Sequence, residues 1–192
     1  MTTPGRHLGV FPECAAHWDW MAEKIINGKQ KTKGEIQVLN LFGYTGLASL
    51  ACAASGAKVT HVDASKKSVS WAHANQVLSG LAEKPVRWIV DDALKFVERE
   101  ARRGIKYDGI LLDPPKFGRG PKGEVWEVYK SLPQLLRACR AGVECPAPIR
   151  GANDVRRQTA GHSRLHCTGR DDERLRREPG MRRIGDRGKE RR

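Results

Sequence analysis

Four short apolar runs, separated from one another by helical patterns, constrain the fold of this 192-residue chain more than any other feature. The runs are Ile36–Leu41, Lys58–Val62, Val86–Val90 and Tyr107–Leu112. They are nearly continuously apolar, as expected for strands that are covered on both faces. Strands that alternate with helices predict parallel βαβ units. The sequence therefore predicts an α/β fold with a Rossmann-like, doubly wound and mainly parallel sheet.

The segments between these runs show the periodicity of amphipathic helices. Glycines at positions 56 and 104 are stop signals at the ends of two of them. The Lys-rich segment Gly28–Glu35 is predicted to be a loop, and Pro133 is expected to kink or divide the last helix. A short extended piece, His7–Phe11, precedes the first helix. The predicted helices are Ala15–Asn27, Leu47–Ser55, Lys67–Leu81, Ala93–Arg103 and Val125–Ala138.

The composition changes abruptly at Cys139. Residues 139–192 hold 14 Arg, 1 Lys and 8 acidic residues but no Phe, Trp or Tyr, so they supply more than half of the formal charge of +13. Such a segment buries too little apolar area to offset its ordering entropy, and we expect it to be disordered. Two origins of this segment stay open. It is either a natural Arg-rich arm that binds phosphates, or the product of translating GC-rich DNA out of frame. The near-complete change from Lys to Arg favours the second.

The net charge predicts an anionic partner, of which nucleic acid is the commonest kind, and a basic surface that serves only solubility is the alternative. The five cysteines contain no C-x-x-C pair, which argues against a disulfide framework and against a structural zinc site. No apolar run is long enough to span a membrane. Met1–Arg6 lacks the apolar core of a signal peptide. We therefore expect a cytoplasmic protein with no metal and no membrane contact.

The residues that follow each predicted strand carry the most information about function. Ligands of doubly wound sheets bind at the carboxyl ends of the strands, where the order of the strands reverses. After the first run, the turn Asn40–Gly46 contains glycines at 43 and 46, which let the backbone approach a ligand closely. Their spacing differs from G-x-G-x-x-G, which disfavours a dinucleotide-binding loop. A plain strand-to-helix turn is the alternative interpretation.

Acidic residues follow the second and third runs. Asp63 stands where a carboxylate accepts hydrogen bonds from the two ribose hydroxyls of a nucleoside cofactor. Aspartates at strand ends also cap helices, so this signal is weak by itself. Asp91 and Asp92 either contact an adenine amino group or cap the helix that begins at Ala93. The sequence leaves these two alternatives open.

The most specific motif follows the fourth run and comprises Asp113-Pro114-Pro115 with Phe117 after Lys116. Two prolines form a rigid turn and leave its carbonyl groups free to accept hydrogen bonds. An aspartate and a carbonyl held in this way suit a planar, amine-bearing base on which Phe117 stacks. We therefore predict catalytic roles for Asp113, Pro114, Pro115 and Phe117, and a plain rigid loop is the alternative.

Three cations lie in and after this motif, within a loop rich in Gly and Pro. Lys116, Arg119 and Lys122 suit the phosphates that flank a target nucleotide. A solvated loop explains the same residues equally well. The sequence therefore nominates these three side chains as candidate contacts to nucleic acid.

Four stretches together resemble the class I S-adenosylmethionine-dependent methyltransferases. They are LNLFGYTG, THVDAS, VDDALKF and YDGILLDPPKFG, and the upstream RHLGVFPE resembles an extended lead-in to such a catalytic domain. The pattern is most similar to the bacterial family related to large-subunit ribosomal RNA cytosine-C5 methyltransferases. It covers residues 4–138 and is specific as a set, although each motif by itself is common.

This resemblance implies a cofactor, a substrate and a division into domains. The cofactor is S-adenosylmethionine and the partner is RNA, with ribosomal RNA favoured; the resemblance sets no oligomeric state. The implied domains are a lead-in and helix over residues 1–34, a truncated cofactor-binding methyltransferase domain over 35–138 and the basic tail over 139–192. The residues implied to surround the cofactor are Asn40, Phe42, Gly43, Tyr44, Thr45, Gly46, Asp63, Ala64, Asp91, Asp92 and Ala93.

The chain also departs from this family. We find no RNA-binding domain of the PUA kind before the lead-in, Cys14 replaces a Gln common in relatives, and no strands or nucleophilic cysteine follow the fourth run. Tyr107–Leu112 is therefore expected to be an open, apolar sheet edge that favours aggregation. The leading hypothesis is a truncated methyltransferase whose activity is weak or absent. A non-catalytic basic RNA-binding module and a nucleotide-binding oxidoreductase are the alternatives.

Overall fold

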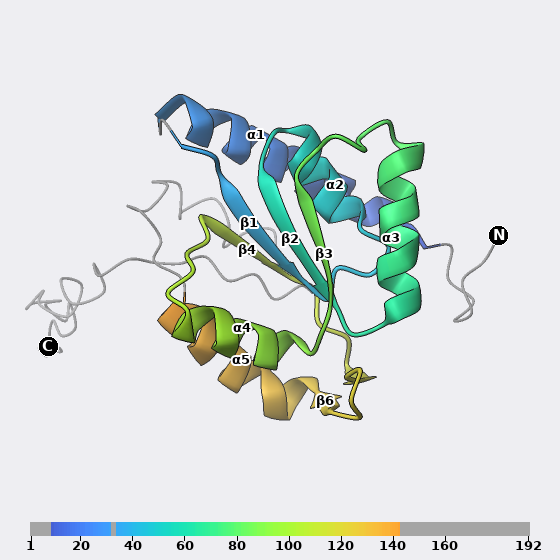
Figure 1. Cartoon of the computed structure of the whole chain (residues 1–192), viewed down its shortest axis with the longest axis vertical. Coiled ribbons are helices and arrows are strands. Elements are labelled where there is room, and N and C mark those ends of the chain that lie inside the picture. Colours follow the sequence, from blue (N-terminus) through green and yellow to red (C-terminus); the bar gives the residue numbers. More distant parts are fainter. Residues whose placement is uncertain (1–8, 32–33, 143–192) are drawn as a thin grey trace, which may run out of the picture.

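A computed structural model describes residues 9–31 and 34–142 of the chain (Figure 1). Its centre is a parallel sheet of four strands in the order β3-β2-β1-β4. These strands are β1 Gln37–Leu41, β2 Lys58–Asp63, β3 Val86–Val90 and β4 Gly109–Leu112. A second, antiparallel sheet pairs β5 Phe117–Arg119 with β6 Val125–Glu127. The helices are α1 Ala15–Lys31, α2 Leu47–Ala54, α3 Lys66–Leu78, α4 Ala93–Arg102 and α5 Val128–Gly142, and the 3-10 turn η1 Pro12–Cys14 precedes α1.

Helices cover both faces of the four-stranded sheet (Figure 1). On one face, Val38 of β1 and Val59 of β2 pack with Met21 and Ile25 of α1 and with Cys52 of α2. On the other face, the core contains residues of α4 and α5. Its members are Leu39, Leu41, Val62, Ala93, Phe96, Val97, Tyr107, Leu112, Trp126, Leu135 and Cys139. The side chains of each strand alternate between these two cores, so the predicted doubly wound α/β fold is confirmed.

The two central strands are more deeply buried than the outer two. Four of the five residues of β1 and four of the six residues of β2 are buried, whereas β4 has one buried residue and β3 has none. Within the described part of the chain, β4 pairs with β1 alone and lies at one edge of the sheet. The predicted open edge is therefore present there, and its effect on aggregation stays a prediction. The predicted disordered tail, residues 139–192, lies beyond the described residues except for its first four, which continue α5.

The order of the strands reverses between β1 and β4. From β1 the chain moves through α2 and α3 to β2 and β3 on one side, and then returns through α4 to β4 on the other side of β1. At such a switch point the loops after the two neighbouring strands separate and leave room for a ligand at their carboxyl ends. The turn that follows β1 and the turn that follows β4 therefore frame the expected binding site.

Three local predictions are wrong. Helix α1 continues to Lys31 and includes residues 28–31 of the predicted loop, since a single glycine is tolerated inside a helix. Helix α5 runs through Pro133, so the expected division of the helix is wrong, while a kink at Pro133 stays a prediction. Residues 117–127, expected to be loop and the start of a helix, form the β5–β6 hairpin instead. Its turn is closed by Gly123, whose φ of 88° favours glycine and whose amide donates to the carbonyl of Gly120.

Candidate functional site

The turn between β1 and α2 is held in an unusual backbone conformation. Phe42 and Tyr44 have φ values of 59° and 50°, in the left-handed region that side chains rarely adopt. The amide of Gly43 donates to the carbonyl of Val62 at 3.1 Å, and the amide of Gly46 donates back to the carbonyl of Gly43 at 3.0 Å. Strained conformations of this kind persist where the surroundings hold them, and they are enriched at functional sites.

Asp63 connects the end of β2 to this turn. Its Oδ2 accepts a hydrogen bond from the amide of Tyr44 at 2.9 Å, and its Oδ1 accepts one from the amide of Ser65 at 2.8 Å. Burial raises the pKa of the Asp63 carboxyl, and the two backbone hydrogen bonds partly offset this rise. A carboxylate oxygen accepts more than one hydrogen bond, so Asp63 keeps acceptor capacity for two hydroxyl groups. The neighbouring Ala64 is half-buried.

A chain of buried polar groups lies beneath the turn. Asn40 Nδ2 donates to Ser49 Oγ at 2.9 Å, and Ser49 Oγ lies 3.0 Å from His61 Nδ1. The Ser49 hydroxyl therefore links the Asn40 amide to the imidazole of His61 in one buried chain. Within the described residues, Nε2 has no hydrogen-bond partner. Burial lowers the pKa of His61 to about 4.

His61 also explains why residue 43 is glycine. A Cβ at that position would overlap the imidazole ring, which also packs on Trp88 with the ring centroids 4.6 Å apart. Gly46 is restricted in a similar way, because its φ is 87° and a Cβ there would lie 2.8 Å from the Cβ of Ala72. Both glycines of the turn are therefore required by close packing.

The lead-in to the domain packs on the same turn. Thr45 is buried, and its Oγ1 donates to the carbonyl of Gly9 at 2.6 Å. The carbonyl of Thr45 accepts from Asn75 Nδ2 of α3 at 2.9 Å. Phe11 lies against Tyr44, with ring centroids 6.1 Å apart. The turn is thus enclosed by the lead-in on one side and by α3 on the other.

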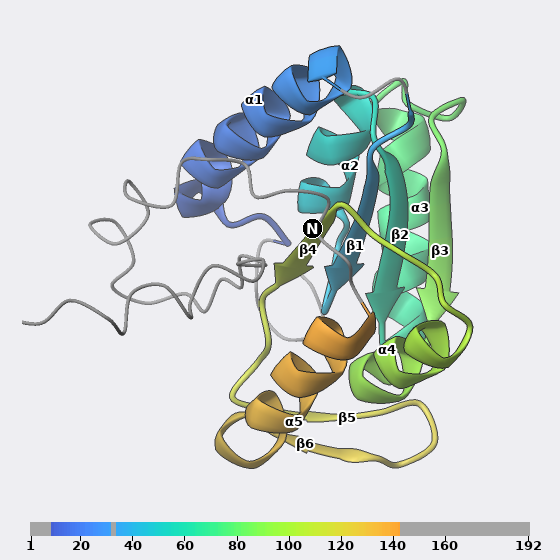
Figure 2. The same ribbon diagram turned by 90° about the vertical axis from the view of Figure 1, so that its left-hand side faces the viewer.

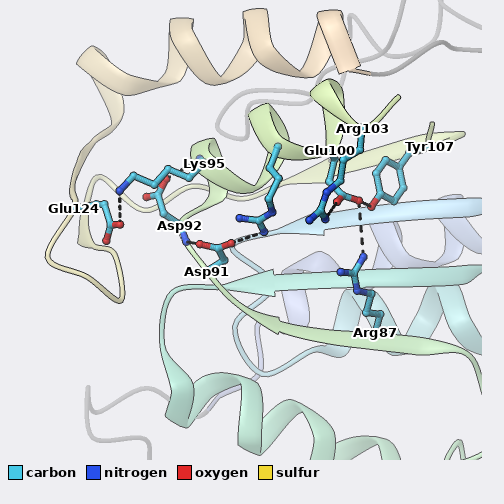
Figure 3. A network of polar contacts seen from close by, with 9 residues as sticks. Arg87, Asp91, Asp92, Lys95, Glu100, Arg103, Tyr107 and Glu124 are labelled. Carbon is cyan, nitrogen blue, oxygen red and sulfur yellow. Dashed lines mark hydrogen bonds and ion pairs between the residues drawn. The ribbon is translucent and has the colours of Figure 1, made fainter. Parts of the chain in front are cut away.

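The structure places the two aspartates that follow β3 in different roles (Figure 3). Asp92 is the N-cap of α4, because its Oδ1 accepts from the amide of Lys95 at 3.0 Å. Asp91 forms an ion pair with Arg99 at 2.6 Å and accepts from the amide of Asp92. The capping alternative therefore holds for Asp92, while contact of either residue with an adenine stays a prediction. Ala93, in the first turn of α4, is buried.

The Asp113-Pro114-Pro115 turn lies next to the turn after β1, since β4 pairs with β1. The side chain of Asp113 is exposed, whereas Pro114 is half-buried. The carbonyl of Pro115 accepts a hydrogen bond of 2.7 Å from Trp126 Nε1, so the expectation that the carbonyls of this turn are free is wrong for Pro115. Trp126 is 4% exposed and also packs on Phe42, with ring centroids 4.8 Å apart. Trp126 therefore connects the two turns.

The candidate RNA-contacting residues lie on the β5–β6 hairpin and just before it. Lys116, Phe117, Arg119 and Lys122 are all exposed. The ammonium group of Lys116 lies over the ring of Phe117 at 5.8 Å from its centroid. The structure thus brings the three nominated cations and the aromatic side chain into one short segment beside the Asp113 turn.

Three residues of this site were not nominated from the sequence, namely Ser49, His61 and Trp126. The signal for His61 was present, because a titratable side chain inside an otherwise apolar strand is unusual. Ser49 and Trp126 gave no such signal, since their roles depend on partners that only the packing of the elements brings near.

Within ranges 9–31 and 34–142, no group of three or more His, Cys, Asp or Glu side chains is arranged to hold a metal ion. In the same ranges, no helix combines the length and the apolar character needed to cross a membrane.

Solved structures of methyltransferases share this fold. A SAM-dependent methyltransferase from Agrobacterium tumefaciens is 55% identical, with a TM-score of 0.70 over 74% of this chain and 44% of that protein. SMU.776, a protein solved in complex with SAH, is 30% identical, with a TM-score of 0.57 over 71% of this chain and 34% of that protein. The fold is therefore that of the S-adenosylmethionine-dependent methyltransferases.

Sequence relatives agree with this class. The ribosomal RNA large subunit methyltransferase K/L of Shewanella frigidimarina is 36% identical over 118 residues, which are 60% of this chain and 16% of that protein. The family described as Conserved hypothetical protein 95 matches residues 16–132. The chain belongs to this family, and the resemblance to class I methyltransferases is confirmed. The chain spans less than half of the solved relatives and about a sixth of the curated relative.

Proposed function

We propose that this chain is the cofactor-binding part of an S-adenosylmethionine-dependent methyltransferase that acts on a base in RNA, with ribosomal RNA as the favoured substrate. The observation that carries the proposal is the pair of turns at the switch point between β1 and β4. One is the strained, glycine-containing turn that is bound to Asp63, and the other is the Asp113-Pro114-Pro115 turn. Relatives named as methyltransferases, one of them for ribosomal RNA, support the same reaction and substrate class.

The residues present fit this cofactor. Asp63 is proposed to accept from the ribose hydroxyls with the acceptor capacity that its two backbone hydrogen bonds leave free. When bound, S-adenosylmethionine supplies an electrophilic methyl group on a sulfonium centre. The turn after β1 is proposed to hold the methionine end of the cofactor, and Asp91 and Asp92 are proposed to contact its adenine. The proposed cofactor-binding set remains Asn40, Phe42, Gly43, Tyr44, Thr45, Gly46, Asp63, Ala64, Asp91, Asp92 and Ala93.

The substrate side is proposed to lie at the turn after β4. The exposed carboxylate of Asp113 is free to orient a base, and Pro114 and Pro115 fix the position of that turn. Phe117 stacks on a base, and Lys116, Arg119 and Lys122 contact phosphates. Alignment of the reacting groups and exclusion of water contribute much of the rate of such a transfer. The acceptor atom, including the cytosine C5 position, and the cytoplasmic location remain predictions, as do the domain limits at residues 34 and 138.

Calorimetry with S-adenosylhomocysteine tests the proposal. We expect the chain to bind this product and Asp63→Ala to weaken binding by about tenfold or more, because a buried carboxylate that accepts two hydroxyls is lost. Asp108→Ala is the matched control. Asp108 also accepts a backbone amide, that of Gln37 at 2.8 Å, but it lies at the opposite end of the sheet. Binding of NADH in place of S-adenosylhomocysteine would support an oxidoreductase and contradict the proposal.

A further inference from the structure

The β5–β6 hairpin has one inner and one outer face. In its register, Gly118 is opposite Trp126 and Arg119 is opposite Val125. Because side chains alternate along a strand, Trp126 enters the core and the neighbouring pairs project outward. Phe117 and Val125 on the outer face are 63% and 72% exposed. The hairpin therefore presents large apolar side chains to solvent, although its inner face is already buried.

The exposed surface continues onto the first turn of α5. The amide of Val128 donates to the carbonyl of Lys116 at 3.0 Å, which places the start of α5 beside β5. The next residue, Tyr129, is 78% exposed. Phe117, Val125 and Tyr129 thus form a group of exposed large apolar side chains, which we call the outer platform. Large apolar side chains that are exposed on one short segment suggest an interaction site.

The platform is attached firmly to the rest of the domain. The Trp126–Pro115 hydrogen bond fixes its inner side. At the tip of the hairpin, Glu124 Oε1 accepts from Lys95 Nζ of α4 at 2.7 Å, as Figure 3 shows. Glu124 Oε2 also accepts from the amide of Lys122 at 2.8 Å. A surface held at both its tip and its base loses little conformational entropy when a ligand binds.

The charges around the platform are positive. The two carboxylates within the hairpin are each paired with a lysine, Glu124 with Lys95 and Glu127 with Lys130. Within the described residues, Lys116, Arg119 and Lys122 have no carboxylate partner, so their charge is available to an anion. The combination of unpaired cations with exposed aromatic rings suits a single-stranded nucleic acid, whose phosphates and bases meet the two kinds of group in turn.

The platform also lies on the substrate side of the proposed active site. Figure 2 shows the hairpin beyond the carboxyl ends of the strands, next to α5. Only Lys116 separates Pro115 of the turn after β4 from Phe117 of the platform. A polynucleotide that places one base at Asp113 therefore has its neighbouring nucleotides within reach of the hairpin.

We propose that the outer platform binds single-stranded RNA at and next to the methylated base, with Phe117 stacking on that base, Tyr129 stacking on a flanking base and Lys116, Arg119 and Lys122 contacting phosphates. This inference rests on the proposed function and extends it from the reacting base to its neighbours. Stacking needs unpaired bases, so single-stranded RNA binds more tightly than duplex RNA of the same sequence.

Fluorescence anisotropy with a labelled single-stranded RNA of about 12 nucleotides tests the inference on the full chain. We expect Phe117→Ala and Tyr129→Ala each to weaken binding by about tenfold, which is within the range for the loss of one stacked base. Arg119→Ala should lower the slope of log affinity against log salt concentration by about 0.7, the value for one phosphate contact with a single strand. Duplex RNA serves as the competitor that lacks accessible bases.

The matched control is Val77→Ala with Leu78→Ala on α3. These side chains are 57% and 84% exposed, but they lie at the end of α3 that precedes β3, away from the hairpin. The control should leave RNA affinity unchanged. The inference would be overturned if the control and platform variants lost RNA affinity equally, or if neither lost any. It would also be overturned if the chain self-associated with increasing concentration and Phe117→Ala abolished that association. The affinity for S-adenosylhomocysteine, measured on the same samples, distinguishes failure of this inference from failure of the proposed function. If the unsubstituted chain does not bind S-adenosylhomocysteine, the proposed function itself is contradicted.

Discussion

Two segments follow neighbouring strands at the switch point, yet they are held in opposite ways. The turn of residues 42–46 is enclosed by contacts from β2, α3 and the lead-in, and two of its residues adopt left-handed backbone conformations. The hairpin of residues 117–127 has one deeply buried side chain, Trp126, and an outer face in solvent. The difference suits two kinds of ligand, a small cofactor that needs fixed backbone groups and a polymer that needs an open surface.

The same difference predicts how substitutions act. The turn of residues 42–46 is held by contacts from several elements, so an added methyl group finds no free space and strains those elements together. In the hairpin, packing against the domain is concentrated in one ring, so the loss of that ring has a large effect while changes on the outer face have small effects on stability. Three substitutions test this contrast.

Trp126→Ala should have the largest effect on stability. It removes a fully packed indole and leaves a cavity, which costs about 3–5 kcal/mol of unfolding free energy. Trp126→Phe keeps most of the ring but removes the hydrogen bond to Pro115, which costs about 1 kcal/mol. Urea unfolding measures both. If Trp126→Ala costs no more than Trp126→Phe, other contacts hold the hairpin and the contrast between the two segments fails.

Gly43→Ala should have an intermediate effect of about 1–3 kcal/mol, because its methyl group overlaps the ring of His61. It should also weaken binding of S-adenosylhomocysteine. Adding His61→Ala removes the overlapping ring, so the two substitutions together should destabilise the protein less than the sum of the single effects. Thermal or urea unfolding of all four combinations measures this coupling.

Gly109→Ala is the control for this cycle, because a Cβ at residue 109 meets no atom within 4 Å. It should change stability little and show no coupling to His61→Ala. Strict additivity of Gly43→Ala and His61→Ala would mean that the ring does not constrain the turn.

Glu124→Gln should have the smallest effect, and that effect should depend on pH. The hydrogen bond from Lys95 lowers the pKa of Glu124 from 4.5 to about 2. A carboxyl whose pKa is depressed in the folded state stabilises the protein above its unfolded pKa, and this contribution disappears as pH falls toward the folded value. We expect Glu124→Gln to lower Tm by about 1–3 °C at neutral pH, and the difference should shrink between pH 4.5 and 2. A difference that stays constant over this range would show that the ion pair contributes nothing.

Much of the framework could be predicted because its signals are local. The strand Val86–Val90 has the bounds that the apolar run predicted, and Asp63 ends β2 as expected. Strand and helix identity follow from the periodicity of neighbouring residues, which is present in the sequence before folding. The hairpin was missed because its strands are three residues long, too short for an alternating pattern to be recognised.

The sequence by itself determined the alternation of strands and helices and the residue types at each strand end. Tertiary structure alone decided which of these residues meet. Residue 43 must be glycine because pairing of β1 with β2 brings His61 beneath it, and no local pattern encodes that register. The carbonyl of Pro115 is occupied because the hairpin returns Trp126, 11 residues later, to within hydrogen-bonding distance. Such contacts depend on the free energy of packing whole elements together, which no single segment of the chain contains.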